Sequence, residues 1–389
     1  MPHQPRTHAR HGQITLHRRT GINPRHRHLR DGLRPVPGAA AHSDPRTQGG
    51  PDHRPRTGAR VVGGARSSQP PAPAPETHDV TPQIQILLAT YNGGNFLAQQ
   101  LDSLFDQTVQ DFEILARDDA SSDDTLAVFA HYMERFPGRI RLLPVESRLG
   151  PALNFGTLLE HSRAPYIMFC DQDDLWHPDK IQRSLARMAQ MEAQYGAGSP
   201  LLVFSDLEVV DYQMQPLAAS FWKHLHMNPR SGSDLSRLLA QNIIAGCTML
   251  LNRPLVDLSL PVPPTAFMHD AWIGLVCACI GRMDYLPETT VRYRQHQNNV
   301  WGAQPTWPPR LPRLLGRLLR RERREFIGQP MAAVLLERFD GRLNAGQRNA
   351  LQVFANLHDQ PGVVRRWQLV RYGFWQHGLI RNIGLLLEI

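Results

Sequence analysis

Short apolar runs alternate with amphipathic segments from residue 84 onward. Five runs predict buried strands: 84–90, 112–119, 139–145, 165–171 and 200–211. Segments with helical periodicity lie between them, at 94–107, 121–136, 151–162 and 177–191. Strand and helix thus alternate four times within about 100 residues, which is typical of βαβ units. The prediction is an α/β fold with a mostly parallel, Rossmann-like sheet flanked by helices.

Polar clusters follow three of the predicted strands. They are "TYNGG" at 90–94, "RDDASSDD" at 117–124 and "CDQDD" at 170–174. In a parallel sheet the carboxyl ends of the strands share one rim, and ligands bind at that rim. Clusters that served only as turns and helix caps would be scattered over both rims. The pattern therefore predicts a ligand site where these three strands end.

The cluster "CDQDD" has the chemistry of a cation site. Asp171 and Asp173 flank Gln172, and side chains two apart in an extended segment share a face. Two carboxylates on one face can bind a hard divalent cation, Mg²⁺ or Mn²⁺, which also accepts phosphate oxygens. The alternative is that Asp173 and Asp174 cap the helix that begins near Pro178.

The other two clusters fit a nucleotide base. A carboxylate of Asp118 or Asp119 can accept a hydrogen bond from the N3–H of a pyrimidine, and the ring of Tyr91, after Thr90, can stack on it. The alternative for both aspartates is a helix cap or an Asx-turn. A base, a diphosphate and a divalent cation together indicate a nucleotide-sugar.

The quoted clusters resemble motifs of glycosyltransferase family 2, whose catalytic domain has the GT-A fold. "ATYNGGNFLAQQLDSLFDQT" resembles its opening strand and helix, "RDDASSDDT" its base-binding motif and "CDQDD" its DXD metal motif. The resemblance covers about 84–302. Within the family it is similar to the bacterial rhamnosyltransferase branch, through these segments: "FCDQDDLWHPDKI", "FSDLEVVD", "GCTMLLNR", "MHDAWIGL" and "VRYRQHQNNVWGA".

The resemblance implies a role for each motif. Base-binding residues would be Thr90, Tyr91, Asp118 and Asp119. Asp171 and Asp173 would bind Mg²⁺ or Mn²⁺ and, through it, the donor diphosphate. Further contacts to the donor or the metal would come from Arg148, Asn154 and His296. Arg148 and Asn154 could each equally be a surface residue or a helix cap, and His296 could be a loop residue.

The resemblance makes Asp270, in "AFMHDAWIGL", the general base that takes a proton from the acceptor hydroxyl. The alternative is an acidic residue that the dipole favours at a helix N-terminus. The implied reaction is an inverting transfer of a sugar, rhamnose from dTDP-rhamnose, to a glycan or lipid-linked acceptor in cell-surface polysaccharide synthesis.

Three rival functions stay open. A UDP-hexose donor would keep the same fold and mechanism. A nucleotidyltransferase would be expected to carry a basic residue in a Gly-rich phosphate loop, and "TYNGGN" has none. A non-enzymatic, basic adaptor that binds nucleic acid or membranes would leave the rim motifs unexplained.

The positive charge is concentrated in the first 80 residues. This arm has 13 Arg and five acidic residues, whereas 81–389 has 30 basic and 30 acidic residues. The neutral body weakens any argument for nucleic-acid binding, so we expect no nucleic-acid partner. The arm is rich in Pro and His and is predicted to be disordered. Because no Met lies between Met1 and Met133, translation could begin near Val80, and the arm would then be missing from the native protein.

The four Cys lie in apolar runs without zinc-like spacing, which indicates a reduced, cytoplasmic protein. No run of about 18 apolar residues predicts a membrane span. The domains expected are the arm, a GT-A domain at 81–302 and a helical accessory region at 303–389. In the last, 310–326 has the pattern of a basic amphipathic helix, which could lie on the inner face of the plasma membrane or pack on the catalytic domain. Further helices are expected near 329–339, 343–357 and 363–388.

Overall fold

The computed structural model describes residues 82–389 except 146, 298, 300–325, 327 and 389. The predicted disordered arm and all of the predicted amphipathic helix except Phe326 lie outside the described residues. The described strands are β1 Ile84–Thr90, β2 Phe112–Asp118, β3 Ile140–Leu142, β4 Tyr166–Asp171, β5 Leu175–Trp176, β6 Leu201–Val210, β7 Pro216–Ala218, β8 Leu250–Asn252 and β9 Arg282–Arg294.

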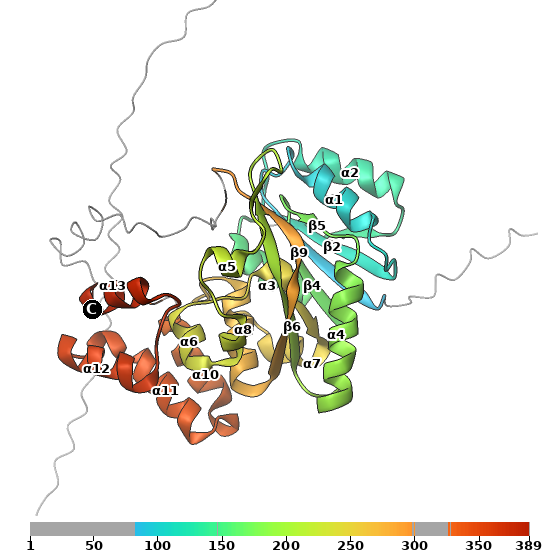
Figure 1. Ribbon diagram of the computed structural model, residues 1–389. Coiled ribbons are helices and arrows are strands. Elements are labelled where there is room, and N and C mark those ends of the chain that lie inside the picture. Colours follow the sequence, from blue (N-terminus) through green and yellow to red (C-terminus); the bar gives the residue numbers. More distant parts are fainter. Residues whose placement is uncertain (1–81, 146, 298, 300–325, 327, 389) are drawn as a thin grey trace, which may run out of the picture. The chain divides into compact units, whose positions relative to one another are not determined.

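These strands form one sheet in the order β3-β2-β1-β4-β8-β6-β9-β5, with β7 paired to β6 (Figure 1). β1 pairs in parallel with β2 and β4, and β2 pairs in parallel with β3. β8 is antiparallel to both β4 and β6, so β6 and its parallel neighbour β9 run in the direction of β1. The predicted mostly parallel sheet is confirmed.

The register places the three polar clusters side by side. Thr90 at the end of β1 pairs with Asp118 at the end of β2, and Ala89 pairs with Asp171 at the end of β4. The strands are buried on both faces, as expected of parallel strands between helices. The shared rim predicted from the sequence is therefore present.

Helices cover both faces of this sheet. Their bounds are α1 Leu97–Phe105, α2 Thr125–Arg135, α3 Pro151–Glu160, α4 Lys180–Tyr195, α5 Phe221–His224, α6 Leu235–Ala240, α7 Arg253–Ser259, α8 His269–Ile280, α10 Gln329–Phe339, α11 Ala345–Ala355, α12 Gly362–Tyr372 and α13 Leu379–Glu388. One core contains Ile86 and Leu88 of β1 with α1, α2 and α4. The other contains Leu87 with α3, α6, α7, α8, α10 and α11. This alternation follows from the two-residue repeat of a strand.

The short elements β5, β7, β8, α5, α6 and α7 were not predicted, and three further differences have a local cause. β3 ends at Leu142 rather than 145, since Pro144 has no N–H for the ladder. β9 was not predicted, because its 13 residues mix polar and apolar positions and contain Pro287 next to a register shift. The helix expected at 363–388 is two helices, because Gly373 takes a left-handed φ of 69° and Gly378 a φ of 93°.

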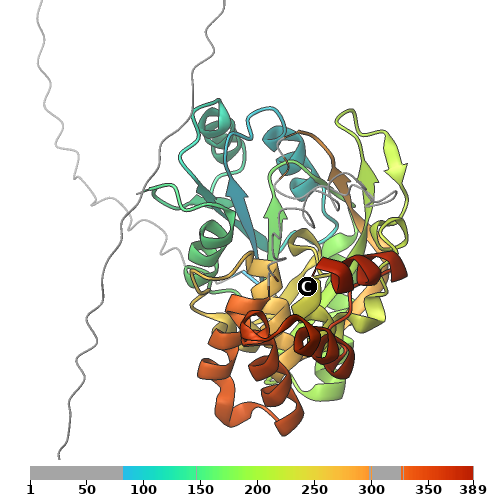
Figure 2. The same cartoon turned by 90° about the vertical axis from the view of Figure 1, so that its left-hand side faces the viewer.

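The C-terminal helices lie away from α1 and α2 in both views (Figures 1 and 2). α10 and α11 are integral to the fold: Leu335 and Phe354 share the core of Trp272, and Arg338 donates to the carbonyl of Pro261 at 2.9 Å. Among the described residues, no helix is both long and apolar enough to cross a membrane.

Candidate active site

Four carboxylates gather where β4 ends. Asp171 is the last residue of β4, Asp173 and Asp174 follow in the turn to β5, and Asp270 comes from the first turn of α8. Asp270 lies close enough to Asp171 for its charge to raise the pKa of Asp171. Two residues 99 positions apart in the chain are thus brought to one site.

These carboxylates are poorly compensated. Burial, with the charges of Asp173 and Asp270, raises the pKa of Asp171 to about 7. Burial and the charges of Asp173 and Asp171 raise the pKa of Asp174 well above its ordinary value. Burial also raises the pKa of Asp270 to about 6, although its Oδ1 accepts from Ala271 N at 2.5 Å and its Oδ2 from Gly246 N at 3.1 Å. Carboxylates that repel one another in a buried place favour the binding of a cation.

Asp174 lies deepest in the cluster. Its Oδ1 accepts from Arg294 N at 3.1 Å, its Oδ2 has no hydrogen-bond partner among the described residues, and the thiol of Cys247 lies next to the carboxyl. One ligand atom each of Asp171, Asp174 and Cys247 lie within 4.8 Å of one another. The ammonium of Lys180, fully buried and 4.5 Å from the ring centroid of Trp176, adds a positive charge below the cluster.

The structure does not support helix capping by Asp173 and Asp174. α4 begins at Lys180, and the residue before it, Asp179, makes no side-chain capping bond. Asp174 instead accepts a hydrogen bond from the backbone N–H of Arg294, and the carboxylate of Asp173 contacts the ring of His296.

His296 reaches Asp173 from the loop after β9. Its Nε2 lies 2.7 Å from Asp173 Oδ2, and its ring stacks on Phe96 with the centroids 4.7 Å apart. The backbone N–H of His296 donates to Asn299 Oδ1 at 2.5 Å, which fixes the loop locally. The predicted site residue His296 is therefore beside the acidic motif, 123 positions away in sequence.

The aspartates at the end of β2 have many partners. Asp118 accepts from Thr90 Oγ1 at 2.9 Å, from Ser121 N at 2.7 Å and from Ser121 Oγ at 2.5 Å. Asp119 accepts from Leu149 N at 2.7 Å and from Gly150 N at 2.8 Å, just before α3. Both are buried. Asp118 thus makes a local turn contact of the kind that the Asx-turn alternative predicts, and Asp119 holds the loop before α3.

Arg117 is the counter-charge of Asp119. Its Nη1 lies 3.0 Å from Asp119 Oδ1 and 3.0 Å from Asn154 Oδ1, and both charged side chains are 4% exposed. Asn154 is buried beside this ion pair, whereas the side chain of Arg148 is exposed to solvent. The Arg148 guanidinium lies 3.7 Å from the ring centroid of Tyr91, itself 37% exposed. Tyr91 and Arg148 therefore form the accessible part of this end of the rim.

Gln172 was not among the predicted site residues, yet it joins the two ends. Its Oε1 accepts from Tyr91 N at 2.8 Å and its Nε2 donates to Tyr91 O at 3.0 Å. A Cβ on Gly93 would lie 2.2 Å from this Oε1, so a glycine is needed there. The position between two aspartates carried no signal for this contact, because the partner is backbone from another strand.

His269, next to the predicted base, has a different environment. Its ring lies among Phe155 and Phe169, with centroids 4.0 and 4.6 Å away, and burial lowers its pKa to about 3. It is therefore neutral at ordinary pH and packs as part of the core.

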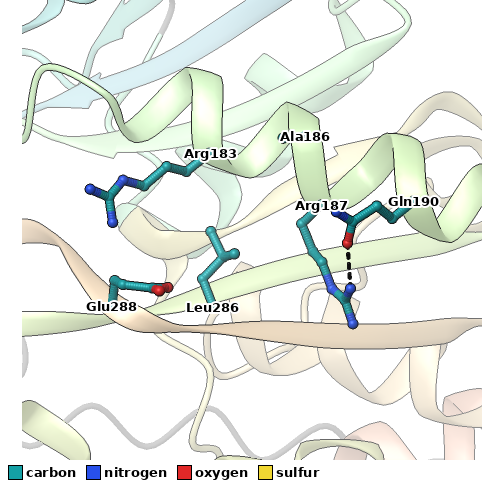
Figure 3. A pocket seen from close by; sticks show the side chains of 6 residues that line it. All are labelled: Arg183, Ala186, Arg187, Gln190, Leu286 and Glu288. Carbon is teal, nitrogen blue, oxygen red and sulfur yellow. Dashed lines mark hydrogen bonds between the residues drawn. The ribbon is translucent and has the colours of Figure 1, made fainter.

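A surface pocket lies apart from these residues, between α4 and β9 (Figure 3). It is lined by Arg183, Ala186, Arg187, Gln190, Leu286 and Glu288. Arg187 donates to Gln190 Oε1 at 2.6 Å and forms an ion pair with Asp284. The pocket contains none of the predicted site residues.

Comparison with known proteins finds a family model that matches part of the chain. Residues 85–257 match the model of glycosyl transferase family 2. An uncharacterized protein of Mycobacterium tuberculosis is 26% identical over 72% of this chain and 80% of its own length. The dTDP-rhamnosyl transferase RfbG of Shigella flexneri is 26% identical over 58% of this chain and 78% of its own length. Among solved structures, S. aureus TarS 1-349 in complex with UDP-GlcNAc has 16% identity and a TM-score of 0.46, and the match covers 74% of this chain and 83% of that one. The predicted α/β fold class, a mostly parallel sheet flanked by helices with a helical C-terminal extension, is confirmed.

Proposed function

Because this chain carries a glycosyl transferase family 2 domain over residues 85–257, we propose that it transfers rhamnose from dTDP-rhamnose to a hydroxyl of a glycan or lipid-linked acceptor. The observation that carries the site is the meeting of Asp270 with Asp171 and Asp173 at the carboxyl end of β4. The choice of rhamnose rests on the motifs shared with the rhamnosyltransferase branch and on the relative RfbG. A UDP-hexose donor is the alternative, with the same mechanism.

The base of the donor binds at the ends of β1 and β2. Tyr91 and Arg148 are exposed there and offer a ring and a planar cation on which a base can stack. Thr90, Asp118 and Asp119 form the floor, and Asn154 supports it through Arg117. The two carboxylates already accept several hydrogen bonds from the protein. To bind the base, one of their oxygens must accept a further bond from the base N3–H or lose a protein donor in exchange for it.

The divalent cation, Mg²⁺ or Mn²⁺, fits the carboxylates at the end of β4. Asp171 and Asp173 supply hard oxygen ligands, and His296 can supply an imidazole nitrogen or contact the diphosphate. Burial, and after it the negative charges of Asp173 and Asp270, raises the pKa of Asp171, and a bound cation would offset both effects. When bound, the cation offsets the charge of the diphosphate leaving group.

Asp270 is the general base in this proposal. Its carboxylate takes the proton of the acceptor hydroxyl while the hydroxyl oxygen bonds to the anomeric carbon. The bond from that carbon to the diphosphate breaks in the same displacement, so the anomeric configuration inverts. Two backbone N–H groups, of Ala271 and Gly246, hold the carboxylate in place.

The same proposal covers the domains and the location. Residues 81–302 would form the catalytic unit, and 303–389 an accessory region that brings the enzyme to the inner face of the plasma membrane. The product would enter a cell-surface polysaccharide.

Donor binding by calorimetry tests this function. The titrations compare dTDP-rhamnose, UDP-glucose and UDP-galactose, with and without Mg²⁺ or Mn²⁺, on wild type and Asp173→Ala. A matched control is Asp179→Ala, which removes a carboxylate of the same loop that pairs outward with Arg183. Cation-dependent binding of dTDP-rhamnose that only Asp173→Ala abolishes supports the proposal. Preference for a UDP-sugar would replace the donor, and no binding of any donor would contradict the function.

A further inference from the structure

Helices α12 and α13 expose an unusual amount of apolar surface. Among the described residues 16 large apolar side chains are exposed, and half of them lie within 363–387. Singly scattered apolar residues are normal on a protein surface, whereas a cluster of this kind marks a binding surface. These eight residues, here called the α12–α13 surface, are Val363, Val364, Trp367, Val370, Leu379, Ile380, Ile383 and Leu387.

The exposed residues form a row on each helix. Val363, Trp367 and Val370 follow the spacing i, i+4, i+7, so they share one face of α12. Their side chains are 79%, 60% and 56% exposed, while Leu369 is the buried residue of the helix. A helix that packed on the body would turn its apolar row inward, so α12 has the opposite orientation.

α13 continues the apolar surface. Ile383 and Leu387 are about half exposed, whereas Leu385 is buried against the body. Arg366 of α12 donates from Nε to the carbonyl oxygen of Leu386 at 2.8 Å, which places the two helices together. Both are red in Figure 2, where they lie near the C-terminus.

The charge of this segment is mainly positive. Residues 360–388 contain four arginines, 365, 366, 371 and 381, against one acidic residue, Glu388. Arg366 and Arg371 are exposed and fall on the two flanks of the α12 row. An apolar row with tryptophan between arginines is the pattern of a helix that lies in a membrane interface, where arginine heads reach anionic headgroups.

We propose that the α12–α13 surface docks the protein on an anionic lipid bilayer. Val363, Trp367, Val370 and Ile383 enter the headgroup region, and Arg366 and Arg371 contact lipid phosphates. The complementary charge favours anionic lipid over a second copy of this chain, which would bring arginines against arginines. The inference deepens the membrane location of the proposed function and rests on it, but it does not depend on which donor or acceptor the enzyme uses.

Vesicle flotation of the full chain tests the proposal. The probes are vesicles of phosphatidylcholine alone and of phosphatidylcholine with phosphatidylglycerol. Wild type is compared with Trp367→Glu/Ile383→Glu and with Leu126→Glu/Met133→Glu, which puts the same two charges at exposed positions of α2. We expect binding to the anionic vesicles, a partition constant at least about tenfold lower in the double variant, and wild-type binding in the control.

Two results would overturn the proposal. If the double variant floats as wild type does, another part of the chain binds the lipid. If wild type does not float but is a dimer by light scattering and the variant is a monomer, the surface joins two copies. Equal midpoints of thermal unfolding confirm that the variants are folded. In a second arm, Arg371→Gln should weaken binding to anionic vesicles and leave binding to neutral vesicles unchanged.

Discussion

The two ends of the rim differ in how their carboxylates are satisfied. At the end of β2, Asp118 and Asp119 accept six hydrogen bonds between them, from Thr90, Ser121, Arg117, Leu149 and Gly150. At the end of β4, no hydrogen-bond donor to the Asp171 carboxylate is found among the described residues, and Asp173 has His296. The carboxylates at the end of β2 thus have their hydrogen-bond donors within the protein, here called the complete end. Those at the end of β4, here called the incomplete end, have few donors and would be stabilised by a bound cation.

This difference separates carboxylates that stabilise the fold from carboxylates that are suited to bind a ligand. A buried carboxylate with several donors fixes the chain around it and contributes to stability. A group of carboxylates that repel one another lowers stability, and such groups are found where a ligand supplies the missing charge. The sequence clusters "RDDASSDD" and "CDQDD" are similar in composition, but their environments assign them different tasks.

Removal of the base should have the largest effect. In Asp270→Asn we expect kcat to fall about 10²–10⁴-fold, because the amide cannot accept the proton of the acceptor. Cation-dependent donor binding should persist, as measured by calorimetry. The control is Asp257→Asn, an exposed carboxylate of α7 that should leave kcat unchanged. Full activity of Asp270→Asn would remove this residue from the chemistry.

The activity should also depend on pH through Asp270. Its pKa is raised to about 6 by burial, so the carboxylate is protonated below that pH and cannot act as a base. A bound cation favours the ionised form of Asp270, so it shifts the rising limb of the pH profile to lower pH. We therefore expect kcat/KM to rise with pH along a limb whose midpoint lies at or below about pH 6. A rising limb above pH 7 would contradict the assignment.

The complete end of the rim should be the more costly to damage. In Asp119→Ala the buried Arg117 loses its counter-charge and two loop amides lose their acceptor. We expect the free energy of unfolding to fall by about 3–5 kcal/mol in urea denaturation. As a matched change in a more exposed pair, Asp257→Ala should cost less than about 1 kcal/mol. Equal losses would mean that the Asp119 bonds contribute little.

Gln172 should act on donor affinity. Gln172→Ala removes both bonds to the Tyr91 backbone, so the base-binding loop is no longer held to the acidic turn. We expect KM for the donor to rise about tenfold with a smaller change in kcat, in steady-state kinetics. The control Gln190→Ala removes an amide on the outer side of α4. A fall in kcat alone, with KM unchanged, would show that Gln172 does not position the donor.

Removal of a carboxylate at the end of β4 should change the free energy of unfolding in the opposite direction from Asp119→Ala. With chelator present, Asp171→Asn should raise the free energy of unfolding by about 1 kcal/mol at neutral pH, because repulsion is relieved. The sign follows from a folded pKa of about 7 against an ordinary value of 3.8. The contribution of this carboxyl is fully present below about pH 4 and is lost as pH rises toward 7, so the advantage of the variant should grow over that window. A destabilised variant would contradict the account.

The sequence was informative where the pattern was local. The apolar runs of β1, β2 and β4 predicted the sheet, and their polar ends predicted the rim, since parallel strands end together. The position of Asp270 at a helix start was also readable from "AFMHDAWIGL".

Long-range contacts could not be read from spacing. His296 and Asp173 meet because β9 pairs with both β6 and β5, which brings the residues after β9 next to the turn between β4 and β5. No local pattern in the sequence predicts this pairing. The bonds that complete Asp119 come from the backbone before α3, which any residue type could supply. The break at Gly373 depends on a left-handed conformation that a glycine permits but does not require.

Binding of Mn²⁺ tests the central claim most directly. Electron paramagnetic resonance can follow the signal of free Mn²⁺ as the full chain is added, with dTDP or UDP present to supply the diphosphate. We predict one site per chain in wild type and in Asp179→Asn, and loss of that site in Asp171→Asn. If Mn²⁺ stays free with both nucleotides, or if Asp171→Asn binds it as wild type does, the incomplete carboxylates are not a cation site.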